Sequence, residues 1–67
     1  MNANELKAQI VRAGLSIPKL AEKIGLNKKT LYAKINGESD FKQPEIVSIQ
    51  KVLGLNDEAV FAIFFAG

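Results

Sequence analysis

Apolar residues recur every three or four positions along most of the chain, which is the spacing of a helix with one buried face. Leu6, Ile10 and Ala13 form such a stripe in the first segment, and a glycine follows at position 14. No stretch of four or more residues combines clean alternation of apolar and polar side chains with the β-branched content of a half-buried strand. The pattern therefore predicts an all-α chain whose first helix spans about Asn4–Ala13.

Capping and terminating residues divide the rest of the chain into four more short helices. Ser and Asn side chains accept hydrogen bonds from the first N–H groups of a helix, Pro fits the first turn, and Gly suits the end. Phe41 interrupts a polar connector and is expected to pin it to the core. We expect one domain over residues 1–67, with further helices from Ser16 to Ile24, from Asn27 to Ile35, from Pro44 to Leu53, and from Asn56 or Asp57 to the end.

The segment between Ser16 and Gly37 has the most specific spacing in the sequence. A helix of about eight residues, a glycine turn and a second helix of similar length form a helix-turn-helix, in which one helix braces the other across a DNA duplex. Ala21 is small where the two helices cross, Gly25 supplies a positive φ, and Leu31 closes the core between them. The residues expected in this core and its turn are Leu20, Ala21, Ile24, Gly25, Leu26, Leu31 and Ile35.

The run from Ser16 to Gly37 resembles the helix-turn-helix of the lambda-repressor/Cro-like (XRE) family of phage and bacterial regulators. The part from Phe41 to Phe65 resembles the short phage Cro-like repressors, in which a fifth helix ends the domain. The resemblance implies a five-helix lambda-repressor-like domain that binds double-stranded operator DNA as a transcriptional repressor. In that family the supporting helix commonly begins with a glutamine that helps to hold a backbone phosphate, whereas this chain has Ile17 at that position.

If the helix after Asn27 is the recognition helix, its exposed first turns face the base edges of the major groove. Lysine can donate to O6 and N7 of guanine, and a tyrosine ring can pack on the methyl group of thymine. The residues expected to read bases are Asn27, Lys28, Lys29, Thr30 and Tyr32. The residues expected to contact phosphates, which position the protein without reading sequence, are Ser16, Lys19, Lys34, Asn36 and Lys42.

Charge is distributed unevenly along the 67 residues, and the distribution suits a protein that binds a polyanion. Nine Lys and Arg oppose seven Asp and Glu, for a net charge of +2. Residues 12–36 contain six basic side chains and one acid, whereas residues 43–67 contain one lysine and three acids. Small domains also carry such an imbalance for solubility alone. The spacing of the helices is therefore stronger evidence for DNA binding than the charge is.

The chain has no His and no Cys, which removes the imidazole base, the thiol nucleophile, the disulfide and the usual zinc site. Gly25–Thr30 is like a phosphate-binding loop only in its Lys-Lys-Thr ending. We therefore expect neither an enzyme nor a metal, cofactor or small-molecule ligand. Ala59–Ala66 is far shorter than the roughly 20 apolar residues of a membrane span, and the chain does not begin like a secretory signal, which predicts a cytoplasmic protein. The resemblance to DNA-binding regulators implies that it is associated with the bacterial nucleoid.

The last helix carries more apolar side chains than one face of a small domain can bury. At about 100° per residue, Val60, Ile63 and Phe64 point one way, whereas Phe61 and Phe65 point another. This second face predicts the seam of a homodimer, the alternative being a helix clamped into the core with one Phe exposed. Two other functions remain open: a protein-interaction module of the antitoxin or antirepressor type on the same fold, and a peptide that lies on a membrane surface.

Overall fold

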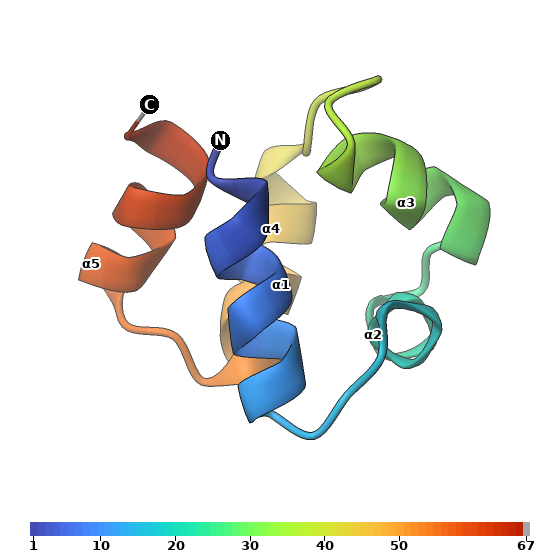
Figure 1. Cartoon of the computed structure of the whole chain (residues 1–67), viewed down its shortest axis with the longest axis horizontal. Coiled ribbons are helices and arrows are strands. Elements are labelled where there is room, and N and C mark those ends of the chain that lie inside the picture. Colours follow the sequence, from blue (N-terminus) through green and yellow to red (C-terminus); the bar gives the residue numbers. More distant parts are fainter. Residues whose placement is uncertain (67) are drawn as a thin grey trace.

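A computed structural model describes residues 1–66, which form helices joined by short connections (Figure 1). No strand occurs in this part of the chain, and the all-α prediction is therefore confirmed. The elements are α1 (Ala3–Arg12), α2 (Ile17–Ile24), α3 (Lys28–Ile35), α4 (Gln43–Leu53), α5 (Asp57–Val60) and η1 (Phe61–Phe65), a π-helix that continues α5.

Side-chain caps explain where several helices begin. The hydroxyl oxygen of Ser16 accepts a hydrogen bond from the backbone N–H of Lys19 at 3.2 Å. At α5 the capping residue is Asn56 rather than Asp57, because the Asn56 Oδ1 accepts from the N–H of Ala59 at 2.8 Å. Each of these bonds satisfies an N–H group that has no partner within the first turn of its helix.

The last helical segment differs from the expectation of one α-helix running to the end of the chain. Its hydrogen bonding widens from α to π at Phe61, and the helix ends at Phe65. The N–H of Ala66 donates to the carbonyl oxygen of Phe61, five residues earlier, at 2.8 Å. Apolar spacing places side chains on faces but does not reveal such a local change in backbone register.

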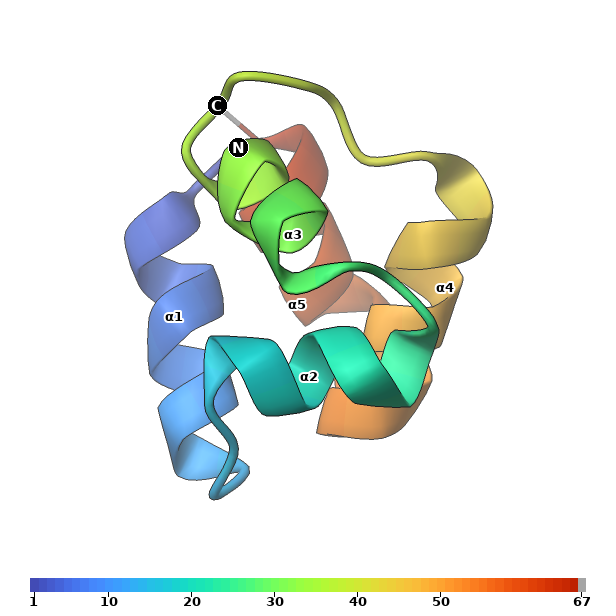
Figure 2. The ribbon, with the colours of Figure 1, turned by 90° about the vertical axis from the view of Figure 1, so that its right-hand side faces the viewer.

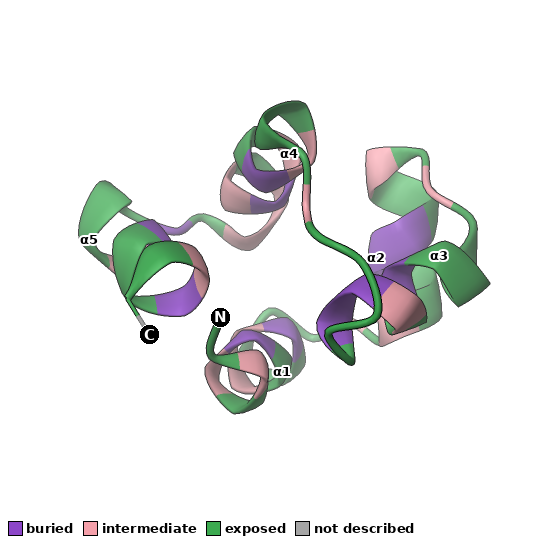
Figure 3. Cartoon of the chain, turned by 90° about the horizontal axis from the view of Figure 1, so that it is seen from above, coloured by how far each residue is buried: buried purple, intermediate pink, exposed green. Residues whose placement is uncertain are grey.

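One core joins all the helices. Its buried side chains are Leu6, Ile10, Leu20, Ala21, Leu31, Ile35, Ile46, Ile49, Leu55, Val60 and Ile63. Figure 3 shows the buried positions facing inward and the outer sides of the helices exposed. The two ends of the chain meet, because the N–H of Asn2 donates to the carbonyl oxygen of Ile63 at 2.7 Å.

α2 and α3 pack against each other and cross steeply. Figure 1 looks down the axis of α2 with α3 lying across the view, and Figure 2 shows the reverse. Of the residues expected between them, Leu20, Ala21, Leu31 and Ile35 are buried, and Ile24 and Leu26 are partly buried against the core. Gly25 is exposed, so its role lies in the conformation of the turn and not in the core.

Gly25→Val is expected to lower the free energy of unfolding by about 1–3 kcal/mol. Gly25 has φ 76° and ψ 24°, a left-handed conformation that a β-branched residue resists. A Cβ there would meet no atom within 4 Å, so the cost comes from the backbone and not from a clash. Thermal unfolding measures the loss, with Gly25→Asn as the control because asparagine tolerates this conformation. Equal melting temperatures for the valine variant and the wild type would contradict this role of the turn.

Candidate nucleic-acid interface

The outer side of α3 is polar and exposed. Lys28, Lys29 and Thr30 are all exposed, and Tyr32 is 42% exposed. Leu31 lies on the inner side of the same helix and is fully buried. Because Leu31 holds the inner side of α3 in the core, two lysine cations, a threonine hydroxyl group and a tyrosine ring are accessible elsewhere on the same helix.

Asn27 fixes the start of this helix and shares its exposed surface. Its Oδ1 accepts a hydrogen bond from the backbone N–H of Lys29 at 2.8 Å. The oxygen is thus used to cap α3, whereas the side-chain NH₂ group carries the donors that an external acceptor requires. Asn27 therefore combines a structural role at the helix start with donors next to Lys28 and Lys29.

Four of the five residues expected to contact phosphates are exposed. Ser16 caps the start of α2, Lys19 lies in its first turn, Asn36 follows the last residue of α3, and Lys42 precedes α4. The Nζ of Lys19 lies 3.4 Å from Oε1 of Glu22. Both side chains of this pair are more than half exposed, and such pairs contribute little energy, so Lys19 is available to an external anion.

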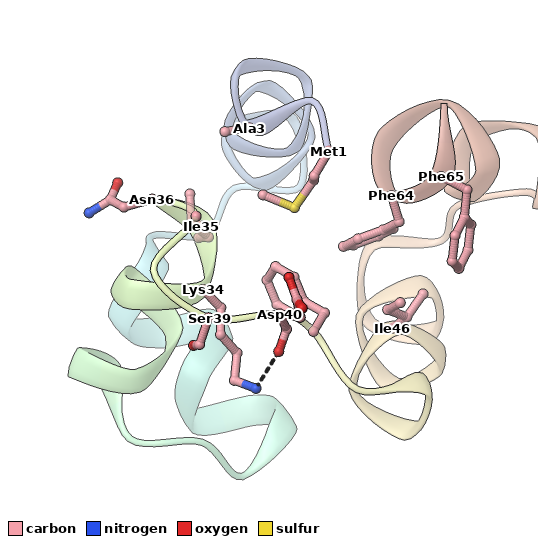
Figure 4. A pocket seen from close by; sticks show the side chains of 12 residues that line it. Met1, Ala3, Lys34, Ile35, Asn36, Ser39, Asp40, Ile46, Phe64 and Phe65 are labelled. Atoms are coloured by element: carbon pink, nitrogen blue, oxygen red, sulfur yellow. Dashed lines mark hydrogen bonds between the residues drawn. The ribbon is translucent and has the colours of Figure 1, made fainter. Parts of the chain in front are cut away.

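Lys34 is the exception, and the prediction that it contacts a phosphate is wrong. Its side chain is 7% exposed. Figure 4 shows its ammonium group directed at the carbonyl oxygen of Asp40, 2.9 Å away. The same Nζ donates to Oε1 of Glu45 at 2.8 Å. Position 34 lies three residues after Leu31, on the side of α3 that faces the core, and two acceptors hold the charge there.

Glu45 has no role in the site predicted from the sequence, but its carboxylate binds both Lys34 and the backbone before α4. Its Oε1 also accepts the backbone N–H of Lys42 at 2.8 Å. The Nζ of Lys34 lies 6.0 Å from the centre of the Phe41 ring. The Phe41 and Phe64 rings form a T-shaped pair with 5.3 Å between ring centres. The predicted role of Phe41 as a pin is thus confirmed. A single buried cation connects α3, the segment before α4, and α4 itself.

A second exposed feature is aromatic and lies on η1. Phe61 is 61% exposed and Phe65 is 53% exposed, with 6.5 Å between their ring centres. Val60 and Ile63 are buried and Phe64 is partly buried, so the predicted division of this helix into two faces is confirmed. We call Phe61 and Phe65 the aromatic patch.

No family model, curated protein or solved structure matches the chain significantly. No helix within residues 1–66 is long and apolar enough to cross a bilayer. In the same part of the chain, no three acidic side chains gather in a way that would hold a metal ion. Function is therefore inferred from the surfaces of the chain itself.

Acid is expected to weaken the fold through Glu45. Burial alone would raise the pKa of this carboxyl group, but hydrogen bonds from Lys34 and from the Lys42 N–H, together with the charges of both lysines, lower it below its ordinary value. A lowered pKa stabilises the fold above the unfolded-state value and loses this contribution as the pH falls through the folded-state value.

The melting temperature should therefore fall as the pH drops below 4.5, the ordinary pKa of the group. Glu45→Gln removes the titrating group and is the control, so its melting temperature should fall less over the same range. Parallel pH profiles for the wild type and this variant would contradict the role of Glu45.

Proposed function

We propose that the protein is a sequence-specific DNA-binding regulator of the lambda-repressor/Cro-like kind, in which α2 and α3 form the helix-turn-helix. The observation that supports this most is the exposed set of Asn27, Lys28, Lys29, Thr30 and Tyr32 on a helix whose other side is anchored in the core. An α-helix fits the major groove of B-DNA, where each base pair presents a distinct pattern of donors and acceptors. The exposed set supplies donors and a ring suited to that pattern.

Within this proposal, the two lysines of the first turn have different partners from the cations around them. Lys28 and Lys29 donate to guanine edges, and Tyr32 packs on a thymine methyl group or donates its hydroxyl. Ser16, Lys19, Asn36 and Lys42 contact the phosphate backbone and orient the domain. The resemblance to phage regulators makes repression of a phage or prophage promoter, on the nucleoid of a bacterial cell, the biological setting that we propose.

Binding of the wild-type protein to short duplex DNA at several salt concentrations tests this proposal. The logarithm of the binding constant should fall linearly with the logarithm of salt, by about 0.9 for each phosphate contact. Vesicles of anionic lipid serve as the comparison, since a membrane-surface peptide would partition to them instead. Duplex binding that is absent, or weaker than vesicle binding, would refute the proposal.

We further propose that the protein binds as a homodimer through the aromatic patch. α3 and η1 lie at opposite ends of the domain in Figures 1 and 3. The domain is 26 Å long, so two copies joined at η1 have room for recognition helices one DNA turn, roughly 34 Å, apart. A two-fold dimer of this kind matches an inverted repeat whose half-sites are separated by about ten base pairs between centres.

Phe65→Glu is expected to give a folded monomer that binds a half-site but loses roughly 100-fold or more in affinity for the full operator. The second contact is no longer intramolecular once the seam is broken. Analytical ultracentrifugation at micromolar concentration and titration of the full operator measure the two effects. Val11→Glu is the control, because Val11 is also apolar and is 72% exposed on α1, outside the patch. Equal behaviour of the two variants would contradict the seam.

One observation favours a second function. The aromatic patch exposes two large rings in a domain of this size, and such patches also bind other proteins. In an antitoxin or antirepressor the patch would hold a protein partner, and α3 would have little affinity for DNA. The duplex titration separates this function from the first.

A further inference from the structure

The connection between α3 and α4 (residues 36–42) is held at its two ends by different means. Near α3, the N–H groups of Gly37 and Glu38 donate to carbonyl oxygens of that helix, at 3.2 and 2.9 Å. Nearer α4, the carbonyl oxygen of Asp40 accepts from Lys34, and the N–H of Lys42 donates to Glu45. The backbone just before α4 is therefore tied to the two side chains of one ion pair.

This pair is largely shielded from water. The side chains of Lys34 and Glu45 are 7% and 17% exposed, and the Phe41 ring lies near the ammonium group. Taking two charges out of water is costly, and apolar residues of similar size often stabilise a protein equally well. Directed hydrogen bonds, however, specify one arrangement of the backbone that they bind. The pair is therefore better explained by the backbone arrangement that it fixes than by a gain in stability.

The position of the connection matters because of the residues that it carries. Asn36 and Lys42 stand at its two ends, and both are exposed. Lys34 belongs to α3 itself, so its bond to Asp40 sets the distance between the recognition helix and the end of the connection. The bond from Lys42 to Glu45 sets the direction in which the chain enters α4.

We propose that Lys34 and Glu45 are positioning residues, which fix the α3–α4 connection so that Lys42 contacts the phosphate backbone while α3 occupies the major groove. The inference rests on the proposed DNA-binding function and deepens it. Neither residue of the pair touches DNA, and both act through the backbone of residues 40–42.

The test compares Lys34→Met, Glu45→Gln and Lys42→Ala by the salt dependence of duplex binding. Each titration is made at a temperature where circular dichroism shows the variant to be folded. Lys42→Ala should lower the salt slope by about one, because one phosphate contact is lost. Lys34→Met should lower it by about the same amount without changing the ranking of operator sequences.

A combined variant distinguishes a positioning role from a structural one. If Lys34 acts through Lys42, adding Lys42→Ala to Lys34→Met lowers the slope no further, because the contact is already lost. The variant Lys34→Met/Glu45→Leu replaces both charges by apolar side chains, and it supplies the same measurement if a single variant fails to fold. Its slope is also expected to be lower by about one.

The possible outcomes separate this inference from the proposed function. Lower melting temperatures with unchanged affinity and salt slope would show a purely structural pair and overturn the inference alone. Additive slopes for Lys34→Met and Lys42→Ala would overturn it as well. A wild-type protein that does not bind duplex DNA would overturn the proposed function, and the positioning role with it.

Discussion

Glu45→Ala is expected to reduce the free energy of unfolding by about 3–5 kcal/mol, the usual cost of removing one partner of a buried ion pair. The substitution leaves the Lys34 ammonium buried, with the Asp40 carbonyl oxygen as its remaining acceptor. It also removes the acceptor of the Lys42 N–H. A domain of 67 residues has a total free energy of unfolding of roughly 3–10 kcal/mol, so the expected loss is a large part of its stability.

Unfolding in urea measures this loss, and a double variant is the control. Lys34→Met/Glu45→Leu removes both charges together and should stay within about 2 kcal/mol of the wild type, because no unpaired charge is left buried. A Glu45→Ala variant as stable as the wild type would show that water reaches Lys34 freely. The buried cation would then have no part in holding α3 to α4.

Lys29→Ala is expected to weaken operator binding by about 1–3 kcal/mol and to change which bases matter. The Lys29 side chain is exposed in the first turn of α3, where a donor reaches base edges if α3 enters the groove. Operators with single base changes measure the effect: at one position, the wild type should discriminate between bases and the variant should not.

Substitutions of two lysines outside α3 serve as controls for this result. Lys19→Ala should weaken all sequences nearly equally, since Lys19 is proposed to contact phosphate. Lys51→Ala removes the same charge from an exposed position of α4 and should change little. A Lys29→Ala variant that loses affinity uniformly across sequences would show that α3 is not the reading helix.

Local signals in the sequence were sufficient to predict most of the helices. Ser16, Asn27 and Asn56 do cap α2, α3 and α5, because capping depends only on the side chain and the next few backbone N–H groups. The division of the last helix also followed from residue spacing, with Ile63 inside and Phe61 outside. The change to π hydrogen bonding was beyond this kind of reasoning, since it alters the backbone without changing the apolar pattern.

Lys34 shows where sequence reasoning about the candidate site failed. Lysines are rarely buried, and this general preference favours a place for Lys34 on the outer surface. Its position three residues after Leu31 was a signal for the inner side of α3. Its partner, however, is eleven residues away on another helix. Only the path of the chain from α3 through residues 36–42 into α4 brings the two side chains together.

Selection of bound sequences from a random library of duplex DNA tests the central proposal most directly. The account predicts enrichment of one inverted repeat, with about ten base pairs between the centres of its half-sites. Lys29→Ala protein, carried through the same selection, should enrich a repeat with relaxed preference at one position in each half. Recovery of no common sequence by the folded wild-type protein would contradict the proposal that α3 reads DNA.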